Sequence, residues 1–262
     1  MSSSKHSSSV IDFISKVDLT ITEWVRDNIS KNKNPFISNA SFYLGLLPYE
    51  LYVLPGMFVA MFVMFYEKSF HPIQFHLLPH WFAFSMARYI KNNFYRIRPG
   101  CIEEVGFSKM INSKHCAEET KTQSFPSGHT NIAVTLATTL RMYLMDETNR
   151  DTDKIFLGIP FYDPLVKNIT IYFGFLVAFM ISIHRISHGY HYFSDVLVGA
   201  ILGYATGYAI YTITNRFKNC NTEENKDDTT WRVVQGVGMV VSFLAVFHFF
   251  VYKFHKLSTI QH

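Results

Sequence analysis

The sequence predicts an all-α polytopic membrane protein, with about six transmembrane helices and an N-terminal amphipathic helix on the membrane surface. Composition is the first reason. Hydrophobic residues make up 48% of the 262 residues and charged residues only 17%, whereas a soluble domain carries roughly 25% charged residues. The second reason is a series of apolar runs of about 20 residues, the length with which a helix crosses a bilayer. So little charge cannot cover a water-facing surface, which excludes an ordinary soluble enzyme, a coiled coil and a disordered chain.

The N-terminal part of the chain is expected to lie outside the bilayer core. Residues 1–9 are rich in serine and are expected to be disordered. Over residues 10–34, apolar residues alternate with charges, which predicts an amphipathic helix lying in the membrane interface. A soluble helix that caps the membrane domain is the alternative. The apolar stretch of a cleaved signal peptide does not follow the N-terminus, so we expect no such peptide.

Residues 35–256 are expected to form one membrane domain. Its candidate spans are residues 42–66, 77–95, 127–144, 165–183, 192–213 and 233–252. Within the fifth of these spans, Gly199, Gly203 and Gly207 recur at four-residue spacing. Small residues at this spacing let neighbouring helices approach closely in lipid. We therefore expect this stripe to serve packing rather than chemistry.

One connection between the candidate spans, residues 99–125, is long and polar, and connections of this length are often functional. It holds Cys101 and Cys116, which can pair if the loop faces an oxidising compartment. Three cysteines in all are too few for a disulfide scaffold and lack the spacing of a metal site. The net charge of +4 is mild, and no cluster of Lys and Arg indicates a nucleic-acid partner.

Charged and polar residues that are costly inside a bilayer occur in three groups near span ends. The groups are Arg88, Lys91 and Arg98; then Phe125, Pro126, Ser127, Gly128 and His129; and then His184, Arg185, His188, His191 and Asp195. A chain that crosses the bilayer in alternating directions brings the ends of the second and fourth spans to the same face as the starts of the third and fifth. We therefore expect the three groups to meet in one site.

The basic residues of these groups indicate a phosphate site. Lys91 and Arg98 are seven residues apart, which places them on one face of a helix, and Arg185 adds a third cation. Arginine binds phosphate oxygens in a bidentate manner. Ser127 and Gly128 open a helix, whose first N–H groups and dipole also favour an anion, and Gly128 lets the backbone come close.

The histidines of these groups indicate phosphoryl-transfer chemistry. His191 and Asp195 are four residues apart, so on a helix they share a face. A carboxylate in that position keeps one imidazole nitrogen protonated and leaves the other free to attack. His129 lies on a different helix, from which it can protonate a leaving oxygen on the opposite side of the phosphorus, as in-line displacement requires.

Three motifs in order carry a family resemblance. They read Lys91-(six residues)-Arg98-Pro99, then Pro126-Ser127-Gly128-His129, then Arg185-(five residues)-His191-(three residues)-Asp195. This arrangement resembles the signature of the type-2 phosphatidic acid phosphatase superfamily, which includes membrane lipid phosphatases and is related to the vanadium haloperoxidases. The surrounding spans fit that family's six-helix layout. One position differs, because the family usually has Ser before the Arg of its third motif, where this chain has His184.

The resemblance implies a phosphatase that uses no metal or other cofactor and works through a covalent phosphohistidine. In that mechanism His191 is the nucleophile and Asp195 its orienting partner, while His129 is the general acid and then the base for water. The resemblance also implies the residues that bind the phosphoryl group, namely Lys91, Arg98, Ser127, Gly128 and Arg185. The Ser that His184 replaces is similar to a phosphate-oxygen donor in the family, so the fit of His184 is an open question.

The expected substrate is a phosphomonoester or diphosphate of a lipid: phosphatidic acid, phosphatidylglycerol phosphate, a polyprenyl diphosphate or a phosphorylated glycolipid of the lipid A type. Some relatives transfer the phosphoryl or head group to another alcohol, so a transferase is an alternative. The expected location is a bacterial inner membrane or a eukaryotic endomembrane, with membrane lipids as the other partners. The motifs indicate no oligomeric state.

Two other classes of protein remain as alternatives. An anion transporter explains Lys91, Arg98 and Arg185 equally well, but it does not require the pairing of His191 with Asp195. A di-iron membrane oxygenase uses clusters of histidine, because imidazole suits iron. Its histidines would be His184, His188 and His191 with His76 and His80. Alternation places these two groups at opposite membrane faces, and the cations beside His184 and His191 repel iron.

The orientation of the site across the membrane is left open by the sequence. Lys and Arg are somewhat more numerous on the loops and termini at the site-bearing face than at the other, and the positive-inside rule then leans towards a cytosolic site. The sites of the family more often face the periplasm or a lumen. With this number of spans, both termini lie at the same face as the site.

Overall fold

The structure of the chain is a computed structural model, which describes residues 4–29, 34–46, 78–102, 116, 123–146 and 164–220. These residues form helices apart from loops and one isolated bridge between Ile97 and Gln123. The helices are α1 (Ser4–Asn28), α2 (Pro35–Leu46), α4 (Leu78–Asn93), the 3-10 helix η3 (Pro99–Cys101), α7 (Gly128–Met145), α8 (Pro164–Ser187) and α9 (Phe193–Cys220). The predicted all-α class is confirmed for this part of the chain.

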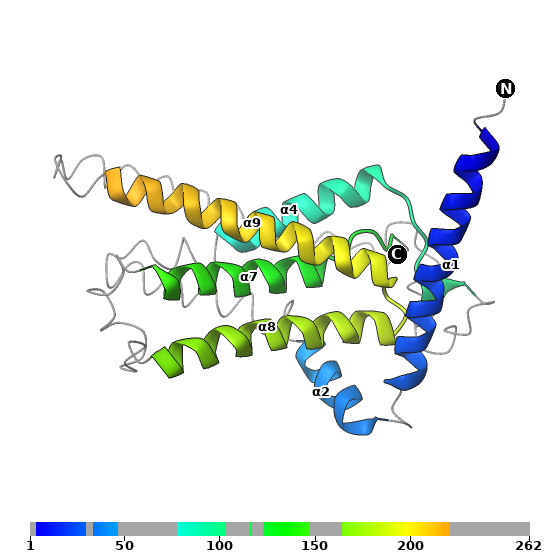
Figure 1. Cartoon of the computed structure of the whole chain (residues 1–262), viewed down its shortest axis with the longest axis horizontal. Helices are drawn as coiled ribbons and strands as arrows, with labels where there is room; N and C mark the ends of the chain where they lie inside the picture. The colour runs from blue at the N-terminus through cyan, green and yellow to red at the C-terminus, as the bar shows by residue number, and fades with distance from the viewer. Residues whose placement is uncertain are drawn as a thin grey trace, which may run out of the picture.

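Helix α7 lies in the middle of a bundle and packs against α4, α8 and α9 (Figure 1). Its buried side chains are mostly small and polar, and they include Thr130, Thr135, Thr138 and Thr139. The hydroxyl of Thr135 donates to Asn131 O at 2.7 Å and lies 3.1 Å from Gly203 O of α9. A buried hydroxyl that bonds its own helix backbone avoids the cost of an unpaired polar group. Small residues of this kind therefore let α7 pack closely on three sides.

The stripe of glycines on α9 faces α7 at close range. A Cβ atom on Gly199 would lie 2.6 Å from Ser127 O, and one on Gly203 would lie 2.5 Å from Asn131 O. One on Gly207 would lie 2.7 Å from Thr135 O. Real Cβ atoms do not approach a backbone oxygen this closely, so only glycine permits the contact at these three turns. The predicted packing role of the stripe is confirmed.

Helices α8 and α9 contain segments, Pro164–Ser187 and Phe193–Arg216, that are long and apolar enough to cross a membrane. Both helices expose large apolar side chains that a water-facing surface would not carry, and these include Phe173, Leu176, Phe179, Ile201, Tyr204, Tyr208 and Ile213. An exposed apolar belt of this size suits contact with lipid. The two segments match the predicted spans 165–183 and 192–213 within a few residues.

The remaining predicted spans are described in part. Helices α4 and α7 match the predictions 77–95 and 127–144, although they contain 16 and 18 residues. Helix α2 begins seven residues before the predicted start at residue 42. The rest of the span 42–66, and the whole of 233–252, lie outside the described residues. The count of about six spans therefore stays a prediction.

Helix α1 stands across the ends of α8 and α9 (Figure 1). Its Val25 packs in a small core with Ile186 of α8 and Val196 of α9, while Trp24 is 63% exposed. The helix begins at Ser4, so residues 4–9 are helical and not disordered as predicted. Once the following turns have formed, adding polar residues to a helix costs little, which explains the early start. Helix α1 thus caps the bundle, and its placement in the membrane interface stays a prediction.

Candidate active site

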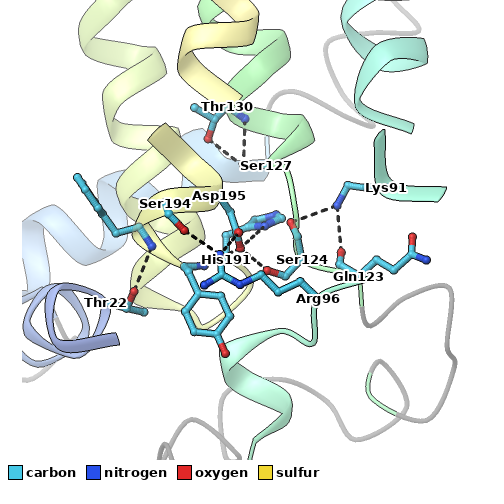
Figure 2. A network of polar contacts seen from close by, with 12 residues as sticks. Thr22, Lys91, Arg96, Gln123, Ser124, Ser127, Thr130, His191, Ser194 and Asp195 are labelled. Carbon is cyan, nitrogen blue, oxygen red and sulfur yellow. Dashed lines mark hydrogen bonds and ion pairs between the residues drawn. The ribbon is translucent and has the colours of Figure 1, made fainter. Parts of the chain in front are cut away.

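The first and second polar groups are joined by two short extended segments that run side by side. Ile97 forms a bridge with Gln123, and the N–H of Ser124 donates to Arg96 O at 2.8 Å. From the end of α4, Lys91 Nζ donates to Gln123 O at 3.0 Å and lies 3.4 Å from Ser124 O (Figure 2). The lysine therefore reaches the segment that leads into α7.

Lys91 and Arg98 do not share a helix face, contrary to the prediction from their seven-residue spacing. Helix α4 ends at Asn93, and Arg98 has an extended backbone with φ −69° and ψ 143°. Proline disfavours helical geometry in the residue before it, and Pro99 follows Arg98 directly. Arg98 instead lies beside Tyr190, with its guanidinium carbon 5.7 Å from the ring centre. The structure still brings both cations to the same end of the bundle.

The start of α7 has the predicted helix-opening arrangement. Ser127 is the N-cap: its hydroxyl lies 2.9 Å from Thr130 Oγ1 and accepts from the N–H of Thr130 at 3.5 Å. The N–H of Ser127 donates to Asp195 O at 3.0 Å, which ties α7 to the start of α9. Gly128 and His129 form the first turn, where backbone N–H groups have no partner within the helix. The Ser127 hydroxyl therefore serves the cap, and the open first turn offers donors for an anion.

The third group reaches the other two through the end of α8 and the turn that follows. Arg185 Nη2 lies 2.7 Å from Nδ1 and 2.6 Å from Nε2 of His129. After Ser187 the chain reverses through Gly189, whose positive φ of 71° is one that glycine adopts readily. The carbonyl of Gly189 accepts from the N–H of Gly100 at 2.9 Å. These contacts place all three polar groups together, as alternation of the spans predicted.

Tyr190 lies between two of the predicted phosphate-binding arginines. Its ring centre is 4.6 Å from the guanidinium carbon of Arg185 and 5.7 Å from that of Arg98. Burial lowers the pKa of Arg98 below its ordinary value. Among the described residues, Arg98 Nε is buried without a hydrogen-bond partner. A buried guanidinium with an unused donor has the chemistry of a site for an anion.

His191 precedes α9, which begins at Phe193, so the two ends of the predicted pair do not lie on one helix face. They meet because Asp195 turns back towards the helix start, where its Oδ2 accepts from the N–H of Tyr192 at 2.9 Å. An acidic residue in the first turn often caps the start of a helix in this way. His191 Nδ1 then lies 3.8 Å from Asp195 Oδ2. This distance is longer than a direct hydrogen bond, and such catalytic contacts often shorten only when substrate binds.

The imidazole of His191 is neutral in this environment. Burial, together with the cations Lys91 and Arg98, lowers the pKa of His191 to about 3, although Asp195 opposes the shift. A neutral imidazole keeps a lone pair on one nitrogen. This is the form that a nucleophile requires.

Four residues around Asp195 were not singled out by the sequence patterns. Arg96 donates to Asp195 Oδ1 at 2.6 Å, and the Ser124 hydroxyl donates to Asp195 Oδ2 (Figure 2). Arg96 also donates through Nη2 to Asp18 of α1 and through Nη1 to the Ser194 hydroxyl. The sequence offered a signal for Arg96, which lies two positions before Arg98, and for Ser124, which directly precedes the second group. Nothing in the sequence near Asp18 indicated the site.

His184, at the position where the family usually has Ser, is buried, and its ring centre lies 4.1 Å from that of His188. The described residues contain no group of three or more His, Cys, Asp or Glu side chains arranged to hold a metal ion. His76, on which the di-iron alternative relies together with His80, lies outside the described residues.

Comparisons with known proteins agree with these motifs. The sequence profile of the PAP2 superfamily matches residues 81–219, which include every site residue that the sequence predicted. A curated protein of Dictyostelium discoideum, described as PA-phosphatase related, is 29% identical over 104 residues, or 40% of this chain. The match spans only 34%, about a third, of that relative's length.

Among solved structures, a transmembrane PAP2-type phosphatidylglycerolphosphate phosphatase from Bacillus subtilis has a similar fold. The TM-score is 0.55 at 19% sequence identity, and the match covers 75% of this chain and 86% of the other. A likeness at this identity establishes the fold alone.

Proposed function

Since the chain belongs to the PAP2 superfamily, a family of membrane phosphatases, we propose that it hydrolyses a phosphomonoester or diphosphate of a lipid through a phosphohistidine. The observation that carries the proposal is the meeting of three cations, two histidines and one carboxylate from three distant segments at one end of the helix bundle. A site that only bound anions would need no carboxylate beside one of its histidines.

The phosphoryl group is bound by the residues that the motifs contain. Lys91, Arg98 and Arg185 neutralise its charge, and the N–H groups at the start of α7, from Gly128 onward, add donors aligned with the helix dipole. The two described contacts of Lys91 use two of the three N–H groups of an ammonium ion. Ser127 contributes by shaping the start of α7.

In the first step Nε2 of His191 attacks phosphorus, and the bond from phosphorus to the leaving oxygen breaks. Asp195 holds the Nδ1 proton and stabilises the imidazolium that forms. His129 gives its proton to the leaving alcohol or phosphate. In the second step water attacks, His129 takes a proton from it, and the P–N bond breaks to release inorganic phosphate and regenerate neutral His191.

The contact between Arg185 and His129 has a consequence for this cycle. Arg185 Nη2 lies 2.6 Å from Nε2 of His129, so a protonated imidazole there would place two like charges in contact. The phosphate of the substrate is a stronger partner for Arg185, so binding draws the guanidinium away from His129. His129 then gains its proton next to the bound dianion, which is the state that a general acid requires.

The surface of the bundle supports a lipid as the substrate. The apolar side chains exposed on α8 and α9 favour contact with lipid acyl chains, and the phosphate site lies at the ends of these helices. The chain therefore acts on a phosphorylated lipid that reaches the site from the bilayer. A transferase differs only in using an alcohol in place of water in the second step.

The orientation of the site follows from the loop after Arg98. Cys101 and Cys116 are joined by a disulfide, and disulfides persist in oxidising compartments such as a lumen or the periplasm. This bond favours a site on the lumenal or periplasmic face, against the small excess of basic residues that favours the cytosol. Labelling of the two cysteines in intact membranes with an impermeant maleimide, before and after reduction, tests the orientation.

One assay tests the function. Purified protein in detergent with EDTA is given a panel of phosphorylated lipids, and inorganic phosphate is measured together with any new phosphorylated alcohol. We expect metal-independent phosphate release that ceases in His191→Ala and is inhibited competitively by orthovanadate, which mimics the pentacoordinate phosphorus. Phosphate release that needs a metal, or persists without His191, contradicts the mechanism. Failure to release phosphate from any member of the panel favours a transporter or a transferase, which the second product distinguishes.

A further inference from the structure

We propose that Arg96 and Asp18 are positioning residues, which hold the Asp195 carboxylate against His191 and so make the N-terminal helix α1 part of the catalytic machinery. The inference rests on the proposed function of His191 and Asp195. It assigns a role to two residues that are not among the defining positions of the three motifs: Arg96 is one of the six residues between Lys91 and Arg98, and Asp18 lies 177 positions before Asp195 in the sequence.

The Asp195 carboxylate is fully buried and held on both oxygens. Oδ1 accepts from Arg96 Nη1 at 2.6 Å. Oδ2 accepts from the Ser124 hydroxyl and from the N–H of Tyr192, and it faces His191 Nδ1 at 3.8 Å (Figure 2). The carboxylate must keep this orientation to hold the imidazole proton. Arg96 supplies the contact to the oxygen that His191 does not use, and therefore sets the rotation of the group.

Arg96 is itself anchored to α1. Its Nη2 donates to Asp18 Oδ2 at 2.6 Å, and its Nη1 also donates to the Ser194 hydroxyl at 2.7 Å. The guanidinium carbon lies 3.9 Å from the centre of the Tyr192 ring. Burial lowers the pKa of Arg96, but Asp195 and Asp18 together raise it above its ordinary value, so the bridge stays charged. The planar fork of arginine can join two carboxylates at once, which the point charge of lysine cannot.

Helix α1 also fixes the turn of α9 that carries Asp195. Asp18 Oδ1 accepts from the N–H of Ser194 at 2.8 Å, and Thr22 Oγ1 accepts from the N–H of Phe193 at 3.1 Å (Figure 2). The first N–H groups of a helix have no partner within it and need one from elsewhere. A carboxylate at this position also meets the positive end of the helix dipole. Side chains of α1 therefore do for α9 what a local N-cap residue does in other helices.

Arg96 differs in its contacts from the arginines that we assign to phosphate binding. Both of its terminal nitrogens are held by carboxylates or a hydroxyl, whereas Arg98 has a buried donor without a partner among the described residues. Loss of Arg96 should therefore affect the chemical step and not the binding of phosphate. A lowered kcat with an unchanged KM is the signature of an interaction that matters in the transition state.

The test uses Arg96→Gln and Asp18→Asn in the full-length protein, assayed on the lipid that the native protein hydrolyses fastest, with inorganic phosphate as the probe of ground-state binding. A misplacement of about 1 Å at a reacting group costs on the order of 100-fold in rate. We expect both variants to lose kcat on that scale, with KM and the inhibition constant of inorganic phosphate unchanged within about twofold. Arg96→Lys should recover part of the loss.

Asp27→Asn is the matched control, since Asp27 lies on the same helix, is exposed and pairs with Arg26 instead of the site. It removes the same charge and should leave kcat unchanged. A second control is Arg96→Gln in the Asp195→Asn background, where the loss of Arg96 should add no more than about twofold, because its partner is already impaired. Thermal unfolding of both variants is measured beside kcat, so that a loss of folding is distinguished from a loss of the chemical step.

Three results would overturn the inference: full kcat in Asp18→Asn and Arg96→Gln, a raised inhibition constant for inorganic phosphate in Arg96→Gln, or additive losses in the double variant. The first means that the anchors are dispensable, the second that Arg96 binds phosphate, and the third that it acts apart from Asp195. Failure of the proposed function itself is separate, because it appears as activity retained in His191→Ala.

Discussion

The packed pair α7 and α9 holds an aspartate at each of its ends, and the two aspartates have different surroundings. At the end away from the site, Asp146 is the C-cap of α7, and it accepts from the Tyr211 hydroxyl and from Asn215 Nδ2 of α9, each at 2.7 Å. At the site end, Asp195 of α9 is fully buried between Arg96 and His191. The Asp146 carboxylate joins the two helices through a hydroxyl and an amide, whereas the Asp195 carboxylate lies beside a cation and an imidazole, and it is the backbone carbonyl of Asp195 that bonds the N-cap of α7.

The comparison shows which features packing does not require. The described contacts between Asp146 and α9 come from a hydroxyl and an amide. Burial of an ion pair seldom improves stability over neutral groups, since removing two charges from water is costly. The charges around Asp195 therefore need another explanation, and catalysis by His191 supplies one. The close glycine packing of α9 belongs to the site end, since it runs from Gly199 beside Ser127 to Gly207 beside Thr135.

The largest expected effect is the contrast between the two aspartates. Asp195→Asn should lower kcat by about 10⁴-fold, the size of the loss when the orienting carboxylate of a catalytic histidine is replaced. Asp146→Asn should leave kcat unchanged, because an amide oxygen still accepts from Tyr211 or Asn215. Phosphate release and thermal unfolding of both variants in detergent give the comparison. Equal losses of activity would show that the two ends do not differ in function.

A smaller effect is expected from the acid on α7. His129→Ala should lower kcat by roughly 10²- to 10⁴-fold on a lipid phosphate, the usual contribution of general acid catalysis. The loss in kcat/KM, which reports the first step alone, should shrink on p-nitrophenyl phosphate, whose leaving group needs little help from a proton. Thr139→Ala, far along the same helix, is the control. A loss of the same size on both substrates would remove the general-acid role.

The glycine packing predicts a change in stability. Gly203→Ala places a methyl group 2.5 Å from Asn131 O and should cost about 1–3 kcal/mol of unfolding free energy. Gly174→Ala on α8 is the matched control, because the nearest atom to its new Cβ lies at 3.8 Å. Thermal unfolding of the two variants should therefore separate them clearly. Similar midpoints would contradict the close approach of α9 to α7.

The smallest effect concerns the pH dependence of stability. Burial lowers the pKa of His191 to about 3, whereas an unfolded chain has a histidine pKa of about 6.5. Between these values the unfolded state binds the proton and the folded state does not. The stability from neutral His191 is therefore complete above the unfolded pKa and falls with pH by up to about 1.4 kcal/mol per unit down to the folded pKa. Unfolding of His191→Ala should lack this component between pH 6.5 and pH 5. An identical pH dependence would mean that His191 is not held neutral.

Much of the site was predictable from the sequence because its chemistry is local. Ser127 and Gly128 predicted a helix start. The alternation of apolar runs across the bilayer predicted that the three motifs lie at one membrane face. Helical spacing was a poorer guide at the ends of helices. Pro99 prevents Arg98 from lying on α4, and His191 meets Asp195 through a turn, not along a helix face.

The remaining part of the site depends on contacts that no local pattern contains. Arg96 stands among several basic and aromatic residues, and only its position opposite Asp195 distinguishes it. Asp18 looked like one charge on an amphipathic helix, since the sequence does not reveal that α1 crosses the start of α9. Long-range placement of this kind depends on how whole helices pack. Sequence patterns therefore identified the reacting groups and missed Arg96 and Asp18, which position them.

The most direct test of the central claim is identification of the covalent intermediate. Protein mixed with substrate is quenched in alkali within milliseconds, digested and analysed by mass spectrometry, because phosphohistidine survives base better than acid. We predict a phosphoryl group on His191, present during turnover, increased when His129→Ala slows hydrolysis of the intermediate and missing from His191→Ala. Steady phosphate release with a phosphoryl group on another residue, or with His191 unmodified throughout, would contradict the account.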